Sequence, residues 1–334
     1  MGCRATFRPS KPTVVDLFAG AGLFSHAFES EGFFIDHAIE MNRHAGATYA
    51  ANFGDRVTVG DVRACIPDGE CDVLIAGPPC QGFSTLGKRD RTDPRNLLSL
   101  ELVRWAATMN PKVIVIENVA AFVGTRVWKL LARRLKRLGY TVTADVCDAA
   151  DFGVPQHRVR SATFASRVGP VEAPIRRPSP AVTVAEAWDG LPSRPDGQGL
   201  NVVLKTTPLA LARMQVIPPG GGKGDIMASA PHLVPPSWHR GRNEITDVWG
   251  RIHWHRPANT LRTVFVNPSK GRYIHPEQDR VMSLREAARI QSIPDEFTFA
   301  STVPYVAAKQ IGNSVPPLLG RAIARQVMRA LGGS

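Results

Sequence analysis

The chain has 334 residues, of which 43% are hydrophobic and 21% are charged, so it can bury a sizeable core and is not an intrinsically disordered protein. No uncharged apolar stretch reaches the roughly 18 residues that a membrane-spanning helix needs, and the first residues lack the apolar centre of a secretion signal, so we expect no membrane association. The formal net charge of +12 favours a polyanionic partner, although a generic basic surface gives the same excess.

The first half of the chain alternates short apolar runs with amphipathic stretches, which is typical of an α/β sheet. We expect strands at residues 13–18, 33–39, 57–59, 72–76, 112–116 and 140–147. We expect helices at residues 23–30, 42–52, 97–109 and 125–138.

The composition and periodicity of the sequence change after about residue 166. Residues 168–251 are rich in Pro, Gly and Arg and show little periodicity, which indicates a second, smaller and looser module. Its segment 218–224, PPGGGKG, is expected to be a loop, because consecutive glycines do not favour regular structure. Helical periodicity returns at residues 283–291 and 317–330.

The five cysteines form no Cys-x-x-Cys pair and no Cys/His cluster at the spacing of a zinc site, so we expect no metal. An odd number of cysteines without a secretion signal indicates reduced thiols in a cytoplasm. Most of the five are expected to be small buried side chains.

Unusual polar or glycine-rich features follow five of the expected strands. Ligands of an open α/β sheet bind at the carboxyl ends of its strands, so we expect these features to line one continuous cleft. In chain order they are Gly20 and Gly22, then Glu40, Asp61, Cys80, and finally Glu117 with Asn118.

The first of these features, DLFAGAGLFS at residues 16–25, has glycines that let a backbone approach a ligand closely. Ser25 stands where a dinucleotide fingerprint needs its third glycine, so an NAD site is disfavoured. Glu40 follows about 20 residues later, where an acid can bind ribose hydroxyls, and Asp61 could accept the amine of an adenine. This pattern favours an adenosine-containing cofactor; alternatively, both acids are ordinary solvated loop residues.

Pro78 and Pro79 stand directly before Cys80 and fix the backbone that carries its thiol. A nucleophile needs a rigid mounting, because misplacement by about 1 Å can cost on the order of a hundredfold in rate. The reactive form is the thiolate, which nearby cations favour, and Arg158 and Arg160 are candidates.

Glu117 ends an apolar strand, where a carboxylate is costly unless it is paired or takes part in chemistry. Partial burial favours its protonated form as a proton donor, whereas a salt bridge to a neighbouring arginine would make it structural. If residues 156–160 form a strand, Gln156, Arg158 and Arg160 share one face, either as a solvated edge or as phosphate and base contacts.

Seven segments of the chain resemble, in their order and in their amino-acid sequences, the motifs of the cytosine-5 DNA methyltransferase family of the bacterial restriction-modification type. The similarity covers nearly the whole chain except about residues 166–250. The segments are DLFAGAGLFS (16–25), GPPCQGFS (77–84), ENV (117–119), ADFGVPQHRVR (150–160), RPANTLRT (256–263), REAARIQSIPDEF (285–297) and QIGNSVPPLLGRAIA (310–324).

This resemblance implies an α/β, Rossmann-like sheet of the S-adenosylmethionine-dependent methyltransferases, with a smaller inserted DNA-recognition domain. Residues 1–165 and 306–334 would form a discontinuous catalytic, cofactor-binding domain. Residues 166–305 would form the target-recognition domain and hinge.

The resemblance also assigns roles to individual residues. Cys80 is the expected nucleophile, Glu117 contacts the cytosine ring, and Gln156, Arg158 and Arg160 complete the catalytic set. Met41 stands where the family often has an aromatic residue, so adenine packing is expected to differ there. The residues expected to bind S-adenosylmethionine are Phe18, Gly20, Gly22, Leu23, Glu40, Met41, Asp61, Val62, Pro79, Asn313 and Ser314.

The implied reaction begins when the Cys80 thiolate adds to carbon 6 of a flipped-out cytosine in duplex DNA, which makes carbon 5 nucleophilic toward the methyl donor. S-adenosylhomocysteine is the expected product. The variable segment would read a short DNA sequence through basic side chains, for which Lys223, Arg240, Arg242 and Arg251 are candidates.

Two alternatives stay open at this point: cytosine-5 methylation of tRNA by a branch with the same motifs, and DNA-binding regulation without catalysis. The chain lacks the Cys-Phe-Thr signature of the tRNA branch and retains both the nucleophile and Glu117, which favours a DNA enzyme. We expect a monomer in the bacterial cytoplasm, associated with the nucleoid. Any cognate restriction endonuclease would be a genetic rather than a physical partner.

Overall fold

The computed structural model describes residues 10–79, 94–177, 180–239, 247–301 and 303–332. The chain divides into two compact units. Unit 1 consists of Met1–Asp148, Val159–Arg176 and Val315–Ser334, and unit 2 consists of Ala149–Arg158 and Arg177–Ser314. Residues 149–158 and 306–314, which the sequence assigned to the catalytic domain, therefore belong to unit 2.

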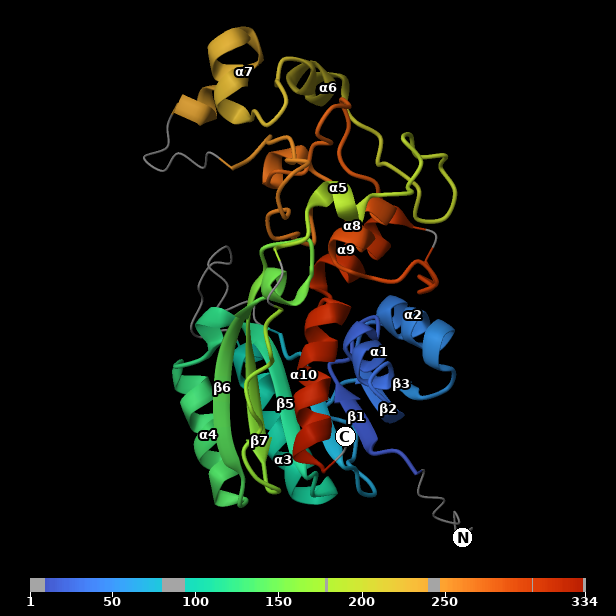
Figure 1. The fold of residues 1–334 in the computed structure, drawn as a ribbon, viewed down its shortest axis with the longest axis vertical. Helices are drawn as coiled ribbons and strands as arrows, with labels where there is room; N and C mark the ends of the chain where they lie inside the picture. Colours follow the sequence, from blue (N-terminus) through green and yellow to red (C-terminus); the bar gives the residue numbers. More distant parts are fainter. Residues whose placement is uncertain (1–9, 80–93, 178–179, 240–246, 302, 333–334) are drawn as a thin grey trace. The chain divides into compact units, whose positions relative to one another are not determined.

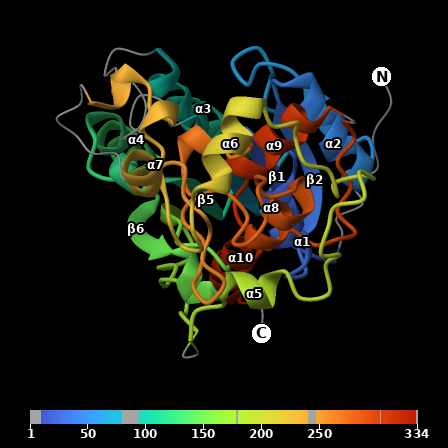
Figure 2. The same cartoon turned by 90° about the horizontal axis from the view of Figure 1, so that it is seen from above.

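Unit 1 is built around a seven-stranded sheet. Its strands are β1 (Thr13–Leu17), β2 (Phe34–Glu40), β3 (Val57–Val59), β4 (Val73–Ala76), β5 (Val113–Val119), β6 (Thr141–Asp148) and β7 (Val159–Ser166). The strand order is β3-β2-β1-β4-β5-β7-β6, so β3 and β6 are the edges, and Figure 2 shows β2 and β6 toward opposite sides of the sheet. The first five strands in this order are parallel, and β7 runs antiparallel to both of its neighbours (Figure 1).

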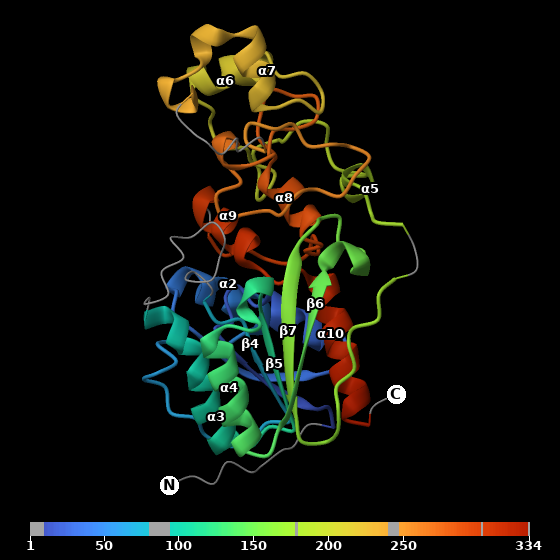
Figure 3. The same cartoon turned by 90° about the vertical axis from the view of Figure 1, so that its left-hand side faces the viewer.

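Helices cover both faces of this sheet, which explains why its central strands are almost continuously apolar. All four residues of β4, VLIA, are buried. Figure 3 shows α3 and α4 on one side of the sheet and α10 on the other. The helices of unit 1 are α1 (Leu23–Glu29), α2 (Arg43–Phe53), α3 (Glu101–Met109), α4 (Arg126–Arg137) and α10 (Pro317–Ala330). The α/β class predicted from the sequence is confirmed.

The C-terminal helix α10 packs closely against α1. Gly320 allows this approach, because a Cβ at that position would lie 2.6 Å from the Cβ of Ala27. Next to this contact, Arg321 and Arg325 both donate to the carboxylate of Glu31. Residues almost 300 positions apart in sequence thus complete the same layer.

Unit 2 has less regular structure. Its described residues form isolated β-bridges rather than named strands. One of its cores gathers Met214, Ile217, Ile226, Trp249 and Ile274. Its helices are α5 (Val184–Ala187), α6 (Pro208–Gln215), α7 (Lys223–Ser229), α8 (Leu284–Ile290) and α9 (Pro304–Asn313).

The predicted elements of unit 1 agree with the structure to within a few residues, whereas unit 2 brings corrections. The segment 218–224 is not entirely a loop, because α7 begins at Lys223. The Asp225 carboxylate accepts a hydrogen bond from the Gly222 N–H at 2.7 Å and so satisfies a free donor where this helix begins. The sequence also predicted no helix at α5, α6 or α9. In unit 1, residues 94–100, which overlap the start of an expected helix, form a 3-10 helix, and the sequence did not predict β7.

None of the helices in the described ranges is long and apolar enough to cross a membrane. Within the same ranges, no group of three or more His, Cys, Asp or Glu side chains is arranged to bind a metal ion.

Candidate active site

The carboxyl ends of the parallel strands meet at one edge of the unit 1 sheet, as the sequence predicted. Just beyond β1, the Ala19 N–H donates to the Ile39 carbonyl of β2 at 3.1 Å. On the other side of β1, the Gly77 N–H donates to the Leu17 carbonyl at 3.3 Å. These bonds connect the segments that follow β1 and β4 to the neighbouring strands, so their side chains share one edge.

The turn after β1 has an unusual backbone. Phe18, Gly20 and Gly22 have φ angles of 61°, 57° and 93°, and such left-handed values are rare for a bulky residue like Phe18. A Cβ on Gly22 would lie 2.8 Å from the Phe53 ring and 2.9 Å from the Tyr49 ring, so this side of the turn is filled. A Cβ on Gly20 would meet nothing within 4 Å. The turn is therefore open to a ligand only on the Gly20 side.

Glu40, at the end of β2, is attached to this turn. Its carboxylate accepts hydrogen bonds from the Gly20 N–H at 2.8 Å and from the Asn42 N–H at 2.6 Å. Asn42 in turn caps α2 by accepting from the N–H groups of His44 and Ala45. The orientation of the Glu40 carboxylate is thus fixed before any ligand binds, which removes the interpretation of Glu40 as a freely solvated loop acid.

Beside Glu40, the Met41 side chain is 70% exposed, and Val59 at the end of β3 is 51% exposed. Apolar side chains this exposed at the carboxyl edge of a sheet provide a surface for a flat apolar group. Leu23 and Val62 differ from them, since both side chains are buried in the core. A ligand would reach Leu23 or Val62 mainly through the backbone.

Asp61, after β3, is paired within its own loop. Both of its carboxylate oxygens accept from the Arg63 guanidinium, at distances from 2.6 to 3.1 Å, and one also accepts from the Arg63 N–H. The hydrogen bonds from the Arg63 side chain and backbone lower the pKa of Asp61 to about 2, so it is ionised at neutral pH. An adenine amine would have to share this carboxylate with Arg63.

A buried polar chain lies beneath the glycine turn, and sequence reasoning missed it. The Tyr49 hydroxyl donates to Ser25 at 2.8 Å, and the Ser25 hydroxyl donates to the Asp16 carboxyl at 2.6 Å. Burial raises the pKa of Asp16 to about 8, partly offset by the Ser25 bond. The signal was available, because Asp16 interrupts the otherwise apolar strand TVVDLF. The chain connects β1, α1 and α2 beneath the candidate ligand surface.

Glu117 and the segment before Cys80 lie further along the same edge of the sheet, in β5 and after β4 respectively. Glu117 lies in β5 and is 9% exposed, and the Arg160 Nε of β7 is 3.3 Å from its Oε1. The side-chain amide of Asn118 donates to the Pro78 carbonyl at 3.2 Å, which fixes the segment before Cys80 beside β5. Cys80 itself lies outside the described residues.

Gln156, Arg158 and Arg160 do not share one strand face, which corrects the expectation from their alternation. β7 begins only at Val159, and Gln156 bridges to Ala258 instead. Arg160 belongs to unit 1, whereas Gln156 and Arg158 belong to unit 2. The reason is that the chain passes from one unit to the other between Arg158 and Val159.

Arg158 is 3% exposed and acts as a connector inside unit 2. Its guanidinium donates to the backbone carbonyls of Leu261, Gly312 and Ser314 at 3.0 to 3.2 Å. These bonds join the segments that contain RPANTLRT and QIGNSVPPLLGRAIA. Both terminal nitrogens of the Arg158 guanidinium therefore bond to backbone acceptors within unit 2.

Gln156 is also fully buried and joins the same segments. Its side-chain oxygen accepts from the Leu261 N–H at 2.8 Å, and its amide donates to the Gln291 side chain at 2.9 Å. Gln291 continues the chain to the Ile311 carbonyl at 2.7 Å. The amide of Gln156 thus has partners on two distant segments.

Asn313 and Ser314 close α9 in unit 2. Asn313 is exposed, whereas the Ser314 hydroxyl donates to the Ile311 carbonyl at 2.7 Å. A Cβ on Gly312 would lie 2.7 Å from the backbone of Arg262, so this turn is packed tightly against its neighbour.

The four predicted DNA contacts have different outcomes. Arg251 is 4% exposed, and its guanidinium donates to Asp279 and to carbonyls that include those of Ile217, Met214 and His275, so a role in direct DNA contact is wrong for this conformation. Lys223 is partly exposed, with its ammonium 5.2 Å from the centre of the Trp238 ring. Arg240 and Arg242 lie outside the described residues.

Comparison with known proteins identifies the family of this chain. The family model of the C-5 cytosine-specific DNA methylases matches residues 12–329. The type II methyltransferase M1.HphI of Haemophilus parahaemolyticus is 36% identical over 95% of this chain and 87% of its own length. The type II methylase M.HgiDII of Herpetosiphon aurantiacus is 31% identical over 96% of both chains.

Solved structures agree with this at the level of the fold. A candidate DNA modification methyltransferase encoded within an E. coli prophage gives a TM-score of 0.70 at 25% identity, covering 96% of this chain and 100% of the other. The Dnmt2 methyltransferase of S. pombe gives a TM-score of 0.65 at 15% identity, covering 96% of this chain and 99% of the other.

Proposed function

Because the chain belongs to the C-5 cytosine-specific DNA methylases, we propose that it methylates cytosine through a transient covalent bond to Cys80, at the carboxyl edge of the unit 1 sheet. The enzyme is a DNA cytosine-5-methyltransferase with type II methyltransferases as relatives. The observation that supports the proposed site most directly is the bond from Asn118, next to Glu117 in β5, to Pro78, because it holds the segment that leads to Cys80 beside Glu117. The Glu117–Arg160 ion pair is the contact that the sequence predicts for a structural carboxylate, so kinetics must separate the two roles.

The residues at the strand ends fit S-adenosylmethionine, which supplies an activated methyl group when it is bound. Glu40 presents a fixed carboxylate suited to ribose hydroxyls, and the open Gly20 side of the turn lets a ligand approach the backbone. Met41 offers an exposed apolar surface to the adenine, and the ionised Asp61 offers an acceptor to its amine. Phe18, Gly22, Leu23, Val62 and Pro79 complete the proposed contacts from unit 1, and Asn313 and Ser314 those from unit 2.

The proposed chemistry begins with Cys80. Its thiolate adds to carbon 6 of a cytosine that has left the base stack, and the electron pair of the 5,6 double bond becomes available at carbon 5. Carbon 5 takes the methyl group. Loss of the proton from carbon 5 then re-forms the double bond and releases the Cys80 thiolate.

Glu117 and Arg160 act on the opposite side of the ring from this bond. A proton shared between Glu117 and ring nitrogen 3 stabilises the negative charge that thiolate addition pushes into the ring. Arg160 fixes the orientation of the Glu117 carboxylate through its ion pair. Arg158 and Gln156 are proposed to support catalysis indirectly, because both terminal nitrogens of the Arg158 guanidinium and the side-chain amide of Gln156 are bonded within unit 2.

Unit 2 is proposed to contain the target-recognition domain, with Lys223 as a candidate DNA contact. A recognition role fits its irregular, loop-rich backbone. We also infer that the enzyme acts as a monomer in the bacterial cytoplasm, together with a genetically linked endonuclease.

Trapping with a modified substrate tests the covalent step. DNA with 5-fluorocytosine at the target stops the reaction after methyl transfer, because carbon 5 then carries no proton to lose. We expect the wild-type protein with S-adenosylmethionine to form an adduct that survives denaturing electrophoresis. Cys80→Ala should form none while binding S-adenosylmethionine within about twofold of wild type, because most of the proposed cofactor contacts follow β1, β2 and β3, and Pro79 is unchanged in this variant.

A wild-type protein that methylates DNA yet never forms the adduct would refute the Cys80 mechanism while leaving the family assignment intact. Before these assays, the target sequence is determined by base-resolution methylation sequencing of DNA from cells that express the chain. Assays on tRNA run beside those on duplex DNA, and we expect no incorporation into tRNA.

A further inference from the structure

Helix α4 of unit 1 presents an unusually basic surface that the proposed chemistry does not use. Its 12 residues, RVWKLLARRLKR, include six cations and no acid. Leu131 and Leu135 are buried against the sheet. At 3.6 residues per turn, most of the cations fall on the opposite side of the helix. All six cations of α4 are exposed, and we define the basic face of α4 as the five that lie on the side away from Leu131 and Leu135: Arg126, Lys129, Arg133, Lys136 and Arg137.

This arrangement opposes helix stability rather than supporting it. Lys129 and Arg133 are four residues apart, as are Arg133 and Arg137, and like charges at this spacing repel. Among the residues that the structure describes, no Asp or Glu forms an ion pair with the basic face. A surface helix normally places acidic and basic side chains three or four residues apart, so that their charges attract each other. Within the part of the chain that the structure describes, the basic face is therefore available to bind an anion.

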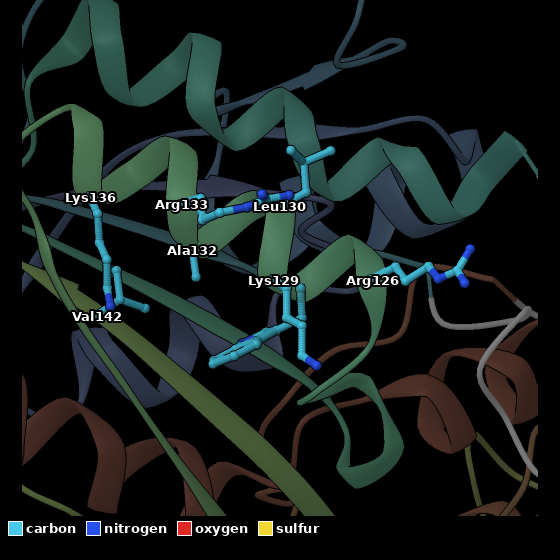
Figure 4. A pocket seen from close by; sticks show the side chains of 8 residues that line it. Arg126, Lys129, Leu130, Ala132, Arg133, Lys136 and Val142 are labelled. Carbon is cyan, nitrogen blue, oxygen red and sulfur yellow. The ribbon is translucent and has the colours of Figure 1, made fainter.

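A hollow of about 670 Å³ adjoins this face, between α4 and β6. Trp128, Ala132 and Val142 provide its apolar lining, and the Trp128 Nε1–H donates to Thr163 at 3.0 Å, which fixes the indole. The cations that line it are Arg126, Lys129, Arg133 and Lys136, and Figure 4 shows them projecting from successive turns of α4. An apolar floor with a cationic rim fits a ligand that alternates apolar sugar with phosphate.

The packing of α4 argues against a membrane surface as the partner. A membrane-bound amphipathic helix inserts its apolar face into lipid. Here Leu131 and Leu135 are already buried in the sheet core, so α4 has no free apolar face to insert. The basic face alone suits a polyanion. From Arg126 to Arg137 the helix rises roughly 16 Å, a length over which duplex DNA presents on the order of ten phosphates.

We propose that the basic face of α4 binds the sugar-phosphate backbone of the substrate DNA outside the recognition sequence. The proposal rests on the proposed function, in which duplex DNA is the substrate. Helix α4 begins one 3-10 turn after β5, the strand that carries Glu117, so it starts at the edge of the sheet that contains the candidate active site. Contacts of this kind add affinity and positioning without adding sequence specificity.

The test compares two variants that lose the same charge. Lys129→Gln/Arg133→Gln removes two cations from the basic face, and Lys11→Gln/Arg329→Gln removes two exposed cations elsewhere on unit 1. Glutamine is a good helix former, so α4 should keep its structure, which circular dichroism checks. Binding is measured on two duplexes with the target sequence at the centre, one of about 14 base pairs and one of about 40.

We expect the α4 variant to bind the longer duplex about tenfold more weakly and the shorter one within twofold of wild type. The slope of log affinity against log salt on the longer duplex should fall by about 1.8, or roughly 0.9 for each phosphate that the variant no longer neutralises. The control variant should keep the wild-type slope and affinity. Turnover at saturating DNA should not change, because neither residue lies at the candidate active site.

Equal losses on both duplexes, equal losses in both variants, or no loss in either would each overturn the role of α4. Failure of the proposed function is distinguishable, because the wild-type protein itself would then form no adduct with 5-fluorocytosine DNA. A wild type that forms the adduct beside an α4 variant with normal binding would reject only the α4 proposal.

Discussion

Two arginines separated by one residue show how differently the two units use charge. Arg160, in unit 1, faces the Glu117 carboxylate at the carboxyl edge of the sheet. Arg158, in unit 2, is buried and donates to three backbone carbonyls. At the edge of the unit 1 sheet, the Glu40 carboxylate is fixed by two N–H donors and the Met41 side chain is exposed. In unit 2, Gln156, Arg158 and Arg251 hold irregular segments together. A charged residue in a motif is therefore free for chemistry only if the fold has not already used its donors.

The largest effect should come from removing the buried connector. Arg158→Ala leaves the carbonyls of Leu261, Gly312 and Ser314 without their partner, and we expect the free energy of unfolding to fall by about 3–5 kcal/mol. Urea denaturation followed by circular dichroism measures this loss. A loss of activity with unchanged stability would instead place Arg158 among the residues that contact the substrate.

The matched change two residues away should separate activity from stability. Arg160→Ala removes the partner of Glu117, and we expect kcat to fall about a hundredfold. The free energy of unfolding should fall by about 1–3 kcal/mol, which is less than for Arg158→Ala, because one mostly buried ion pair is lost rather than three bonds that join separate segments. Single-turnover methylation on duplex DNA measures the first and urea denaturation the second. Arg160→Lys, which keeps the charge without the planar fork, should recover only part of the rate. Similar stability losses for Arg158→Ala and Arg160→Ala would remove the contrast between the two units.

The buried Asp16 makes the stability of unit 1 depend on pH. Burial raises its pKa from 3.8 to about 8 in the folded protein, so the folded state retains a proton that the unfolded state has already lost. Its contribution is fully present below about pH 4 and disappears as pH rises toward 8. We expect the free energy of unfolding to fall by about 1.4 kcal/mol per pH unit inside this window from this group alone. Asp16→Asn should flatten the dependence in urea titrations between pH 5 and 8, and an unchanged slope would show that Asp16 ionises normally.

The smallest expected effect concerns the fixed carboxylate at the glycine turn. In Glu40→Gln, the new amide nitrogen does not accept a hydrogen bond, so the N–H of either Gly20 or Asn42 no longer has its acceptor, and the negative charge is removed as well. We expect S-adenosylmethionine to bind about tenfold more weakly, measured by calorimetry, with kcat at saturating cofactor within threefold of wild type. An effect on kcat alone would move Glu40 from cofactor binding to the chemical step.

The sequence by itself determined six of the seven strands of unit 1, its helices and the polar residues at the strand ends, but not β7 (Val159–Ser166). Periods of 2 and 3.6 residues and the glycine and proline positions are local signals, so they can be read without knowing any distant contact. The same signals identified residues 16–25, Glu40 and Glu117 as neighbours, because parallel strands bring their carboxyl ends to one edge. The family motifs extended these predictions to the reaction and the cofactor.

Only the tertiary structure decided which polar residues are available. The acceptors of Arg158 lie 103 to 156 residues away in sequence, and the burial of Arg251 depends on carbonyls 24 to 37 residues away. Likewise, the buried chain from Tyr49 to Asp16 forms only when α1 and α2 pack over β1. Burial and hydrogen-bond partners are set by contacts between distant segments, and no local period encodes them.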